Sequence, residues 1–248
     1  MKRHLMLFLA VLVASGFNSG AMAQTKTREQ LREEIESKRS ELIALEKQFL
    51  AVPEADRTAF ADLLAEPNTG LIRLLPREIF DSDTYKNNNK KTITMRGGGA
   101  YYSFVRLTHE YGFGSDIELD HDQFLVGFAG YDYGMLLKIH DVSLQDLSAE
   151  YPDAAPLIRY SPPTYEEAIR NEQRAFTLGT VIDGLSLKRI VPVEENATYL
   201  LRSISYRESD ILVGLKVIRR DSDGSVVLAW KLLRKFKAPE VDRRIVAR

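Results

Sequence analysis

The residues most suited to chemistry fall in one stretch rich in Gly and aromatic residues, 96–139. Within it, acidic residues alternate with Ile117 and Leu119, as expected for a strand with one apolar and one acidic face. Carboxylate oxygens are the ligands that a hard cation such as calcium prefers. The candidate metal ligands are Asp116, Glu118, Asp120 and Asp122. No calcium-loop spacing is complete, and a solvent-exposed charged face is the simpler explanation, so no cofactor is expected and calcium is the alternative.

Two histidines of this stretch are candidates for acid–base catalysis. His109 is followed by Glu110, and His121 lies within the acidic run. A hydrolase can use a His as base and a neighbouring carboxylate to orient it. Because the chain has no Cys, the nucleophile would be Ser, Thr or water. No G-x-S-x-G elbow or H-E-x-x-H motif is present, so a small hydrolase is the alternative function, not the leading one.

Aromatic residues are dense in the same stretch. Those in predicted turns, Tyr111, Phe113 and Tyr131, are the ones expected to reach the surface. There they would form a platform for sugar rings or for a protein partner. Packing beneath Gly-rich turns is the alternative. The leading interpretation is therefore a non-enzymatic binding or interaction protein.

Short strands joined by tight turns are predicted to position these side chains. In the central stretch the predicted strands are 92–95, 100–108, 115–120, 123–129 and 133–139. His121 and Asp122 form a predicted hairpin tip. Near the C-terminus, three further strands are predicted at 197–206, 211–219 and 225–236, with a hairpin turn at Asp221–Gly224.

The two β-rich blocks share a plan that suggests an internal repeat. Arg106 corresponds to Arg202, and Asp116 corresponds to Asp210. If the repeat is real, we expect each Arg to pair with its following Asp and to fix strand against turn. The alternative is that any two three-stranded meanders share such features.

The first residues predict export from a bacterial cell. Lys2 and Arg3 precede an apolar run at 5–14, which is too short to span a bilayer, and the A-x-A signal at 21–23 follows. We expect a signal peptide at 1–23 and a periplasmic or secreted protein. No later segment is long and apolar enough to span a membrane. A formal net charge of −1 gives no field that favours nucleic acid.

A charged helix is predicted at 27–50. Its apolar residues follow a heptad-like spacing, at Leu31, Ile35, Leu42, Leu45 and Phe49. Lys38 occupies the missing seam position. The seam would bury itself either against a second copy, giving a homo-oligomer, or against the protein's own body. A second helix at 53–64 and an apolar connector at 70–80 follow.

The sequence as a whole predicts an α+β protein. A helical N-terminal segment precedes a β-rich body of antiparallel meanders, which form two related blocks if the repeat is real. The expected segments are a signal peptide at 1–23, the helical segment at 24–80, the first β block at 81–147, a crossing loop, helix and strand at 148–193, the second β block at 194–239 and a charged tail at 240–248.

Overall fold

The structure is a computed structural model that describes residues 26–81, 92–93, 95–109, 111–112, 114–139 and 142–242. The chain divides into two compact units, Met1–Ile43 and Ala44–Arg248. The predicted α+β class is confirmed, because a helix near the N-terminus precedes a body of antiparallel sheets. The predicted signal peptide and residues 243–248 of the predicted tail lie outside the described residues.

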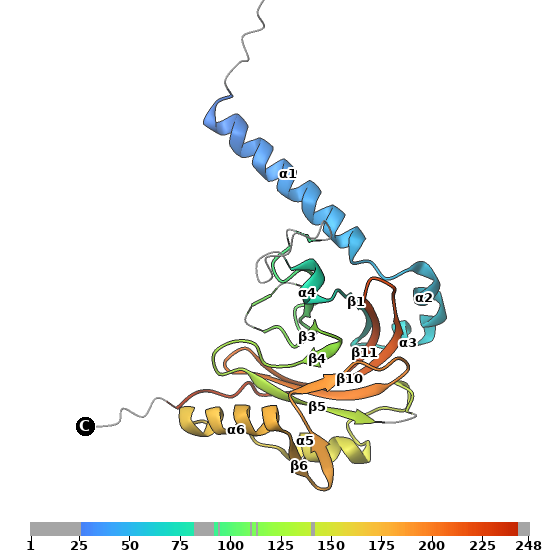
Figure 1. Cartoon of the computed structure of the whole chain (residues 1–248), viewed down its shortest axis with the longest axis vertical. Coiled ribbons are helices and arrows are strands. Elements are labelled where there is room, and N and C mark those ends of the chain that lie inside the picture. Colours follow the sequence, from blue (N-terminus) through green and yellow to red (C-terminus); the bar gives the residue numbers. More distant parts are fainter. Residues whose placement is uncertain are drawn as a thin grey trace, which may run out of the picture. The chain divides into compact units, whose positions relative to one another are not determined.

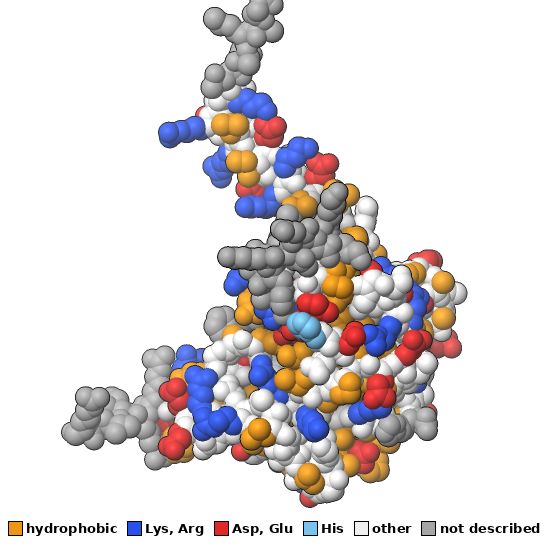
Figure 2. All heavy atoms as spheres, in the orientation of Figure 1, with side chains coloured by type: hydrophobic (Ala, Val, Ile, Leu, Met, Phe, Trp, Pro, Cys, Tyr) orange, Lys and Arg blue, Asp and Glu red, His pale blue; other side chains and the backbone are white. Residues whose placement is uncertain are grey.

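Helix α1 (Arg28–Phe49) confirms the first predicted helix. A capping box begins it, because the Thr27 hydroxyl accepts the Gln30 N–H and the Gln30 side chain accepts the Thr27 N–H. No residue of α1 is buried, and its five apolar seam residues are 41–58% exposed. Figure 2 shows apolar side chains along α1 among charges of both signs. The predicted second helix is two short helices, α2 (Glu54–Ala59) and α3 (Ala61–Ala65).

A five-stranded antiparallel sheet forms the centre of the body (Figure 1). Its strands, in spatial order, are β1 (Thr69–Leu74), β11 (Val226–Phe236), β10 (Ser209–Arg220), β9 (Thr198–Ser205) and β5 (Tyr133–Ile139). The C-terminal meander β9–β10–β11 was predicted and is confirmed.

The connector predicted at 70–80 is wrong, because it forms edge strand β1 and short helix α4 (Arg77–Phe80). Ile72 and Leu74 alternate into the core. A Cβ on Gly70 would lie 2.7 Å from the Trp230 ring, so the absence of a side chain lets β1 pass under the indole.

A four-stranded antiparallel sheet packs on one face of the larger sheet. It contains, in spatial order, β2 (Tyr101–Tyr102), β3 (Ile117–Asp120), β4 (Gln123–Leu125) and β8 (Ile190–Pro192). The strand predicted at 100–108 is wrong after Tyr102. The Leu107 N–H donates to the Ser103 carbonyl at 2.8 Å, and Leu107 has a φ of 57°, so the chain turns tightly there.

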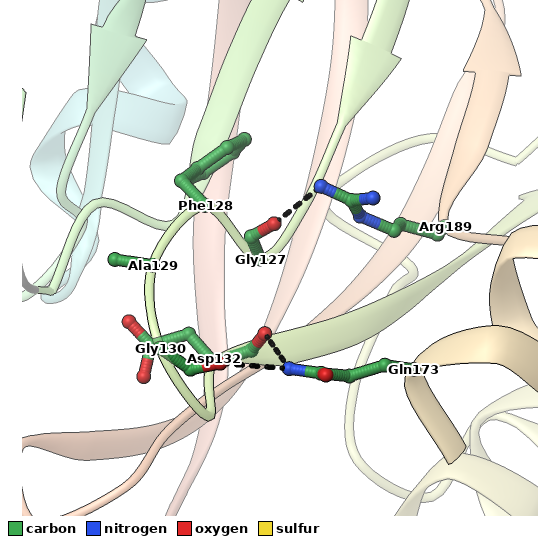
Figure 3. Close-up of a pocket in the computed structure, with 7 residues that line it drawn as sticks. All are labelled: Gly127, Phe128, Ala129, Gly130, Asp132, Gln173 and Arg189. Carbon is green, nitrogen blue, oxygen red and sulfur yellow. Dashed lines mark hydrogen bonds between the residues drawn. The ribbon is translucent and has the colours of Figure 1, made fainter. Parts of the chain in front are cut away.

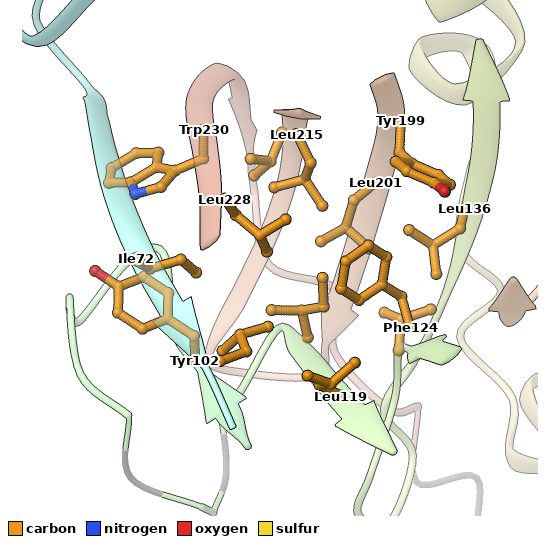
Figure 4. Close-up of a cluster of buried hydrophobic side chains, with 14 of the residues drawn as sticks. Ile72, Tyr102, Leu119, Phe124, Leu136, Tyr199, Leu201, Leu215, Leu228 and Trp230 are labelled. Atoms are coloured by element: carbon orange, nitrogen blue, oxygen red, sulfur yellow. The ribbon is translucent and has the colours of Figure 1, made fainter. Parts of the chain in front are cut away.

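The large sheet is covered on both faces, which makes the body three-layered (Figure 1). Between the sheets lies a core that includes Tyr102, Phe124, Leu201 and Leu228 (Figure 4). The opposite face packs on η1 (Pro152–Ala154), α5 (Ala155–Arg159), α6 (Glu166–Leu178) and the hairpin of β6 (Thr180–Ile182) and β7 (Leu185–Leu187).

The internal repeat stays a prediction, and its Arg–Asp pair is found in the second β block and not in the first. Both β2–β3–β4 and β9–β10–β11 are antiparallel meanders. Arg202 and Asp210 form the expected pair, with Nη2 2.8 Å from Oδ2. Arg106 is instead half-exposed and pairs with Glu208. A common origin of the two blocks therefore stays a prediction.

Candidate functional site

The predicted acidic strand face is wrong, because two of its carboxylates are buried. Asp116 is 0% and Glu118 2% exposed. Arg77 and Tyr101 cover Glu118, each with a polar atom 2.6 Å from its Oε1. Burial raises the pKa of Glu118, and the Tyr101 hydroxyl and Arg77 oppose that rise. Glu118 is therefore part of a buried structural network and not an exposed metal ligand.

The other two predicted metal ligands lie around the β3–β4 turn. His121 and Asp122 form this turn with φ values of 47° and 59°, which confirms the predicted hairpin tip. Asp122 pairs with Arg220. Asp120, His121 and Glu78 have potential ligand atoms within 4.8 Å of one another. His121 Nδ1 lies 3.0 Å from Asp120 Oδ1, and the His121 N–H donates to Glu78, so these groups also stabilise the turn itself.

His109 has a structural environment. Its Nε2–H donates to the Arg73 carbonyl at 2.8 Å, and its ring meets the Tyr102 ring edge-on. Burial lowers the pKa of His109, which keeps the imidazole neutral, while the Arg73 carbonyl opposes that shift. Glu110, its predicted partner, lies outside the described residues. Of the predicted His–carboxylate chemistry, the described residues retain the His121–Asp120 pair at the turn.

Three aromatic side chains form a continuous row. Tyr111 meets Tyr101 with ring centroids 4.6 Å apart, and Phe128 meets Tyr101 from another direction at 5.2 Å. The Arg96 guanidinium lies 5.0 Å from the Tyr111 centroid. We call Tyr111, Tyr101 and Phe128 the aromatic row. Its end members, Tyr111 and Phe128, are half-buried. Phe113 lies outside the described residues.

Tyr131, the third predicted aromatic residue, is held against α6. Its hydroxyl donates to Glu166 at 3.1 Å, Arg170 lies over its ring, and the Tyr206 ring packs beside it. These contacts fix the loop that carries Phe128.

A pocket of about 190 Å³ opens beside Phe128 (Figure 3). It is lined by Gly127, Phe128, Ala129, Gly130, Asp132, Gln173 and Arg189, and we call it the 127–132 pocket. Arg189 donates to the Val126 and Gly127 carbonyls, and Gln173 donates to those of Gly130 and Asp132. The loop is therefore held at both ends by side chains from distant segments.

Glycine permits the fold of this loop. Gly127 has a φ of 81°, and a Cβ there would lie 2.5 Å from Tyr133 Cα. Gly130 also has positive φ, at 56°. These two glycines were the visible signal for the pocket. Phe128, Gln173 and Arg189 were not predicted as site residues, because no local pattern connects the three segments that carry them.

No protein-family model, curated protein or solved structure matches the chain. Function therefore has to be inferred from the site residues and not from the fold. Among the described residues, no helix is long and apolar enough to cross a bilayer. On the face seen in Figure 2, acidic and basic side chains are interspersed.

Proposed function

We propose that this chain is an exported, non-enzymatic binding protein that holds a polar ring, such as a sugar, in the 127–132 pocket. The observation that carries the proposal is the pocket itself, which places the half-buried Phe128 ring beside polar groups. A sugar ring offers an apolar face for stacking and hydroxyls for hydrogen bonds, and this pocket presents partners for both.

The size and rigidity of the pocket support a small ligand. At about 190 Å³ it is smaller than the roughly 300–1,000 Å³ of sites for drug-sized molecules. One ring fits that scale better than an extended chain. Because Arg189 and Gln173 already fix the loop, little conformational entropy is lost on binding.

The export part of the proposal rests on the order of basic residues, short apolar run and A-x-A signal within 1–23. The periplasm or the medium is the expected location. The alternative function, a small hydrolase, is supported by one contact, the His121–Asp120 pair at the β3–β4 turn. Turnover of a bound glycoside would favour that alternative over the binding protein.

Phe128→Ala is expected to weaken sugar binding about tenfold, because losing roughly 1.4 kcal/mol of stacking and apolar contact changes the dissociation constant by that factor. Ligand-observed NMR across a panel of mono- and disaccharides would identify a binder, and calorimetry would compare the variants. Tyr151→Ala, a half-buried aromatic outside the pocket lining, is the matched control. Equal affinity in Phe128→Ala and wild type, or no binding across the panel, would contradict the proposal.

We also propose that the α1 seam binds a second copy of the chain. The mature protein, from Gln24, is then expected to form a dimer, whereas a version beginning at Val52 is expected to be monomeric. Ile35→Glu in the seam should abolish the dimer, because the charge would be buried at the interface. Ile43→Glu is a matched control, since both isoleucines are 58% exposed and Ile43 lies beside the seam. Light scattering decides; a mature protein that stays monomeric at high micromolar concentration rules out self-association.

A further inference from the structure

A buried polar cluster lies at the end of β9, behind the 127–132 pocket. Ser203 and Ser205 are two residues apart on β9 and therefore share one face. Ser205 is paired with Ser209 of β10, and Ile204 with Tyr133 of β5, which brings Asp132 alongside Ser205. Figure 3 shows the Asp132 carboxylate pointing away from Gln173.

Asp116 reaches the same cluster from the small sheet. Its Oδ2 accepts the Phe104 N–H at 2.8 Å, and burial raises its pKa while the Ser203 and Ser103 hydroxyls oppose that rise. The charges of Asp116 and Asp132 also repel, since Asp116 raises the pKa of Asp132. We call Asp116, Asp132, Ser203, Ser205 and Ser209 the β9 polar cluster.

Two oxygens of this cluster, Asp116 Oδ1 and Ser209 Oγ, complete no hydrogen bond within the described residues. The Ser205 hydroxyl has no partner of good hydrogen-bond geometry there, but it lies close enough to Asp132 to lower the pKa of that carboxyl. Asp116 is 0% and Ser205 1% exposed, so bulk water does not satisfy them. Leaving buried polar atoms without partners is costly, so a further partner for these oxygens would stabilise the fold.

The cluster also lacks a direct counter-ion. Among the described residues, no Lys, Arg or His forms an ion pair with Asp116 or Asp132. Arg106 is an opposite charge that acts on Asp116, and it is itself paired with Glu208 at 2.8 Å. Burial raises the pKa of Asp132; the Ser205 hydroxyl and the Tyr206 N–H oppose that rise, and the Glu208 charge adds to it. Two buried carboxylates of this kind need either protons or a bound cation.

We propose that the β9 polar cluster binds a hard cation, calcium being the ion whose chemistry fits best. The Asp116 and Asp132 carboxylates would neutralise it, and the Ser205 and Ser209 hydroxyls would complete part of its oxygen shell. Calcium accepts six to eight oxygen ligands in flexible geometry, whereas magnesium demands a near-ideal octahedron. Bound there, the ion would fix Asp132 and so stiffen the loop that forms the 127–132 pocket.

Thermal unfolding of the full chain, stripped with EDTA and then titrated with calcium chloride at pH 7.5, tests this proposal. Calcium at a hundred times its dissociation constant should raise Tm by about 5–10 °C in a domain of this size. Magnesium chloride and sodium chloride are the comparison probes and should produce smaller shifts. A Tm unmoved by calcium overturns the proposal and leaves protons as the neutralising partner.

Two variants separate this cluster from the acidic group at the β3–β4 turn. Asp116→Asn should abolish the calcium-dependent shift, while Asp120→Asn, which alters the turn group, should retain it. Ser205→Ala keeps both charges and should reduce the shift, which gives a second test of the same cluster. A shift that survives in Asp116→Asn and disappears in Asp120→Asn overturns the proposal. Because Tm is measured without sugar, failure of the proposed sugar binding would leave this result unaffected.

Discussion

Arg202→Met is expected to lower the free energy of unfolding by about 3–5 kcal/mol, because it leaves a charge buried without a partner. Arg202 binds both oxygens of Asp210, with Nε 2.9 Å from Oδ1 and Nη2 2.8 Å from Oδ2. Its Nη1 donates to the Leu157 and Tyr160 carbonyls, and its guanidinium lies 4.0 Å from the Phe236 ring centroid. Both members of the pair are 2% exposed or less, so water cannot replace these bonds.

Chemical denaturation of matched variants measures this effect. The double variant Arg202→Met with Asp210→Leu should recover much of the lost stability, because neither charge then remains buried. Arg159→Met removes one member of the exposed Arg159–Asp183 pair and should change stability by less than about 1 kcal/mol. A loss below about 1 kcal/mol in Arg202→Met would contradict the structural importance of the pair.

Acidification is expected to raise the free energy of unfolding through the two carboxyls of the β9 polar cluster. Burial raises the pKa of Asp116 to about 6 from its usual 3.8, opposed by the Ser203 hydroxyl and the Phe104 N–H. Burial likewise raises the pKa of Asp132 to about 6. The folded state therefore keeps these protons up to a higher pH than the unfolded state does. Above the folded pKa both buried carboxyls are charged, which lowers the free energy of unfolding. The penalty disappears as the pH falls from about 7 to about 4.

Asp116→Asn isolates this effect from other titrating groups, including His109, whose lowered pKa acts in the opposite direction on acidification. In EDTA at pH 7.5 we expect the variant to be more stable than wild type by up to about 3 kcal/mol, since each pKa unit corresponds to 1.36 kcal/mol. Near pH 4 the two should be equally stable. Denaturation curves across this range provide the test; a stability difference independent of pH would show that Asp116 is not the titrating group.

Local patterns predicted the elements whose partners are close in sequence. The strands of the C-terminal meander are long and joined by a recognisable turn, and the His121–Asp122 tip connects adjacent strands. Alternation also predicted correctly that Ile117 and Leu119 face the core. It could not show that the opposite face is covered too, because Arg77 reaches Glu118 from 41 residues away.

The candidate site was predictable only in part, for the same reason. Tyr111 was identified from its place in a Gly-rich turn, and the structure places it in the aromatic row. Arg189 and Gln173 act on carbonyls 62 and 43 residues earlier in the chain, so neither is marked by its sequence neighbours. Asp116 was singled out as an exposed ligand, yet its burial is what makes it unusual.

The pairing of β1 with β11 affects when the protein can fold. Thr69 is paired with Lys231, so the edge of the large sheet joins residues from opposite ends of the body. Such distant contacts require large loop closures and slow folding. The sheet cannot be completed until most of the chain is available, so the edge strand β1 has to wait for the C-terminal strand β11.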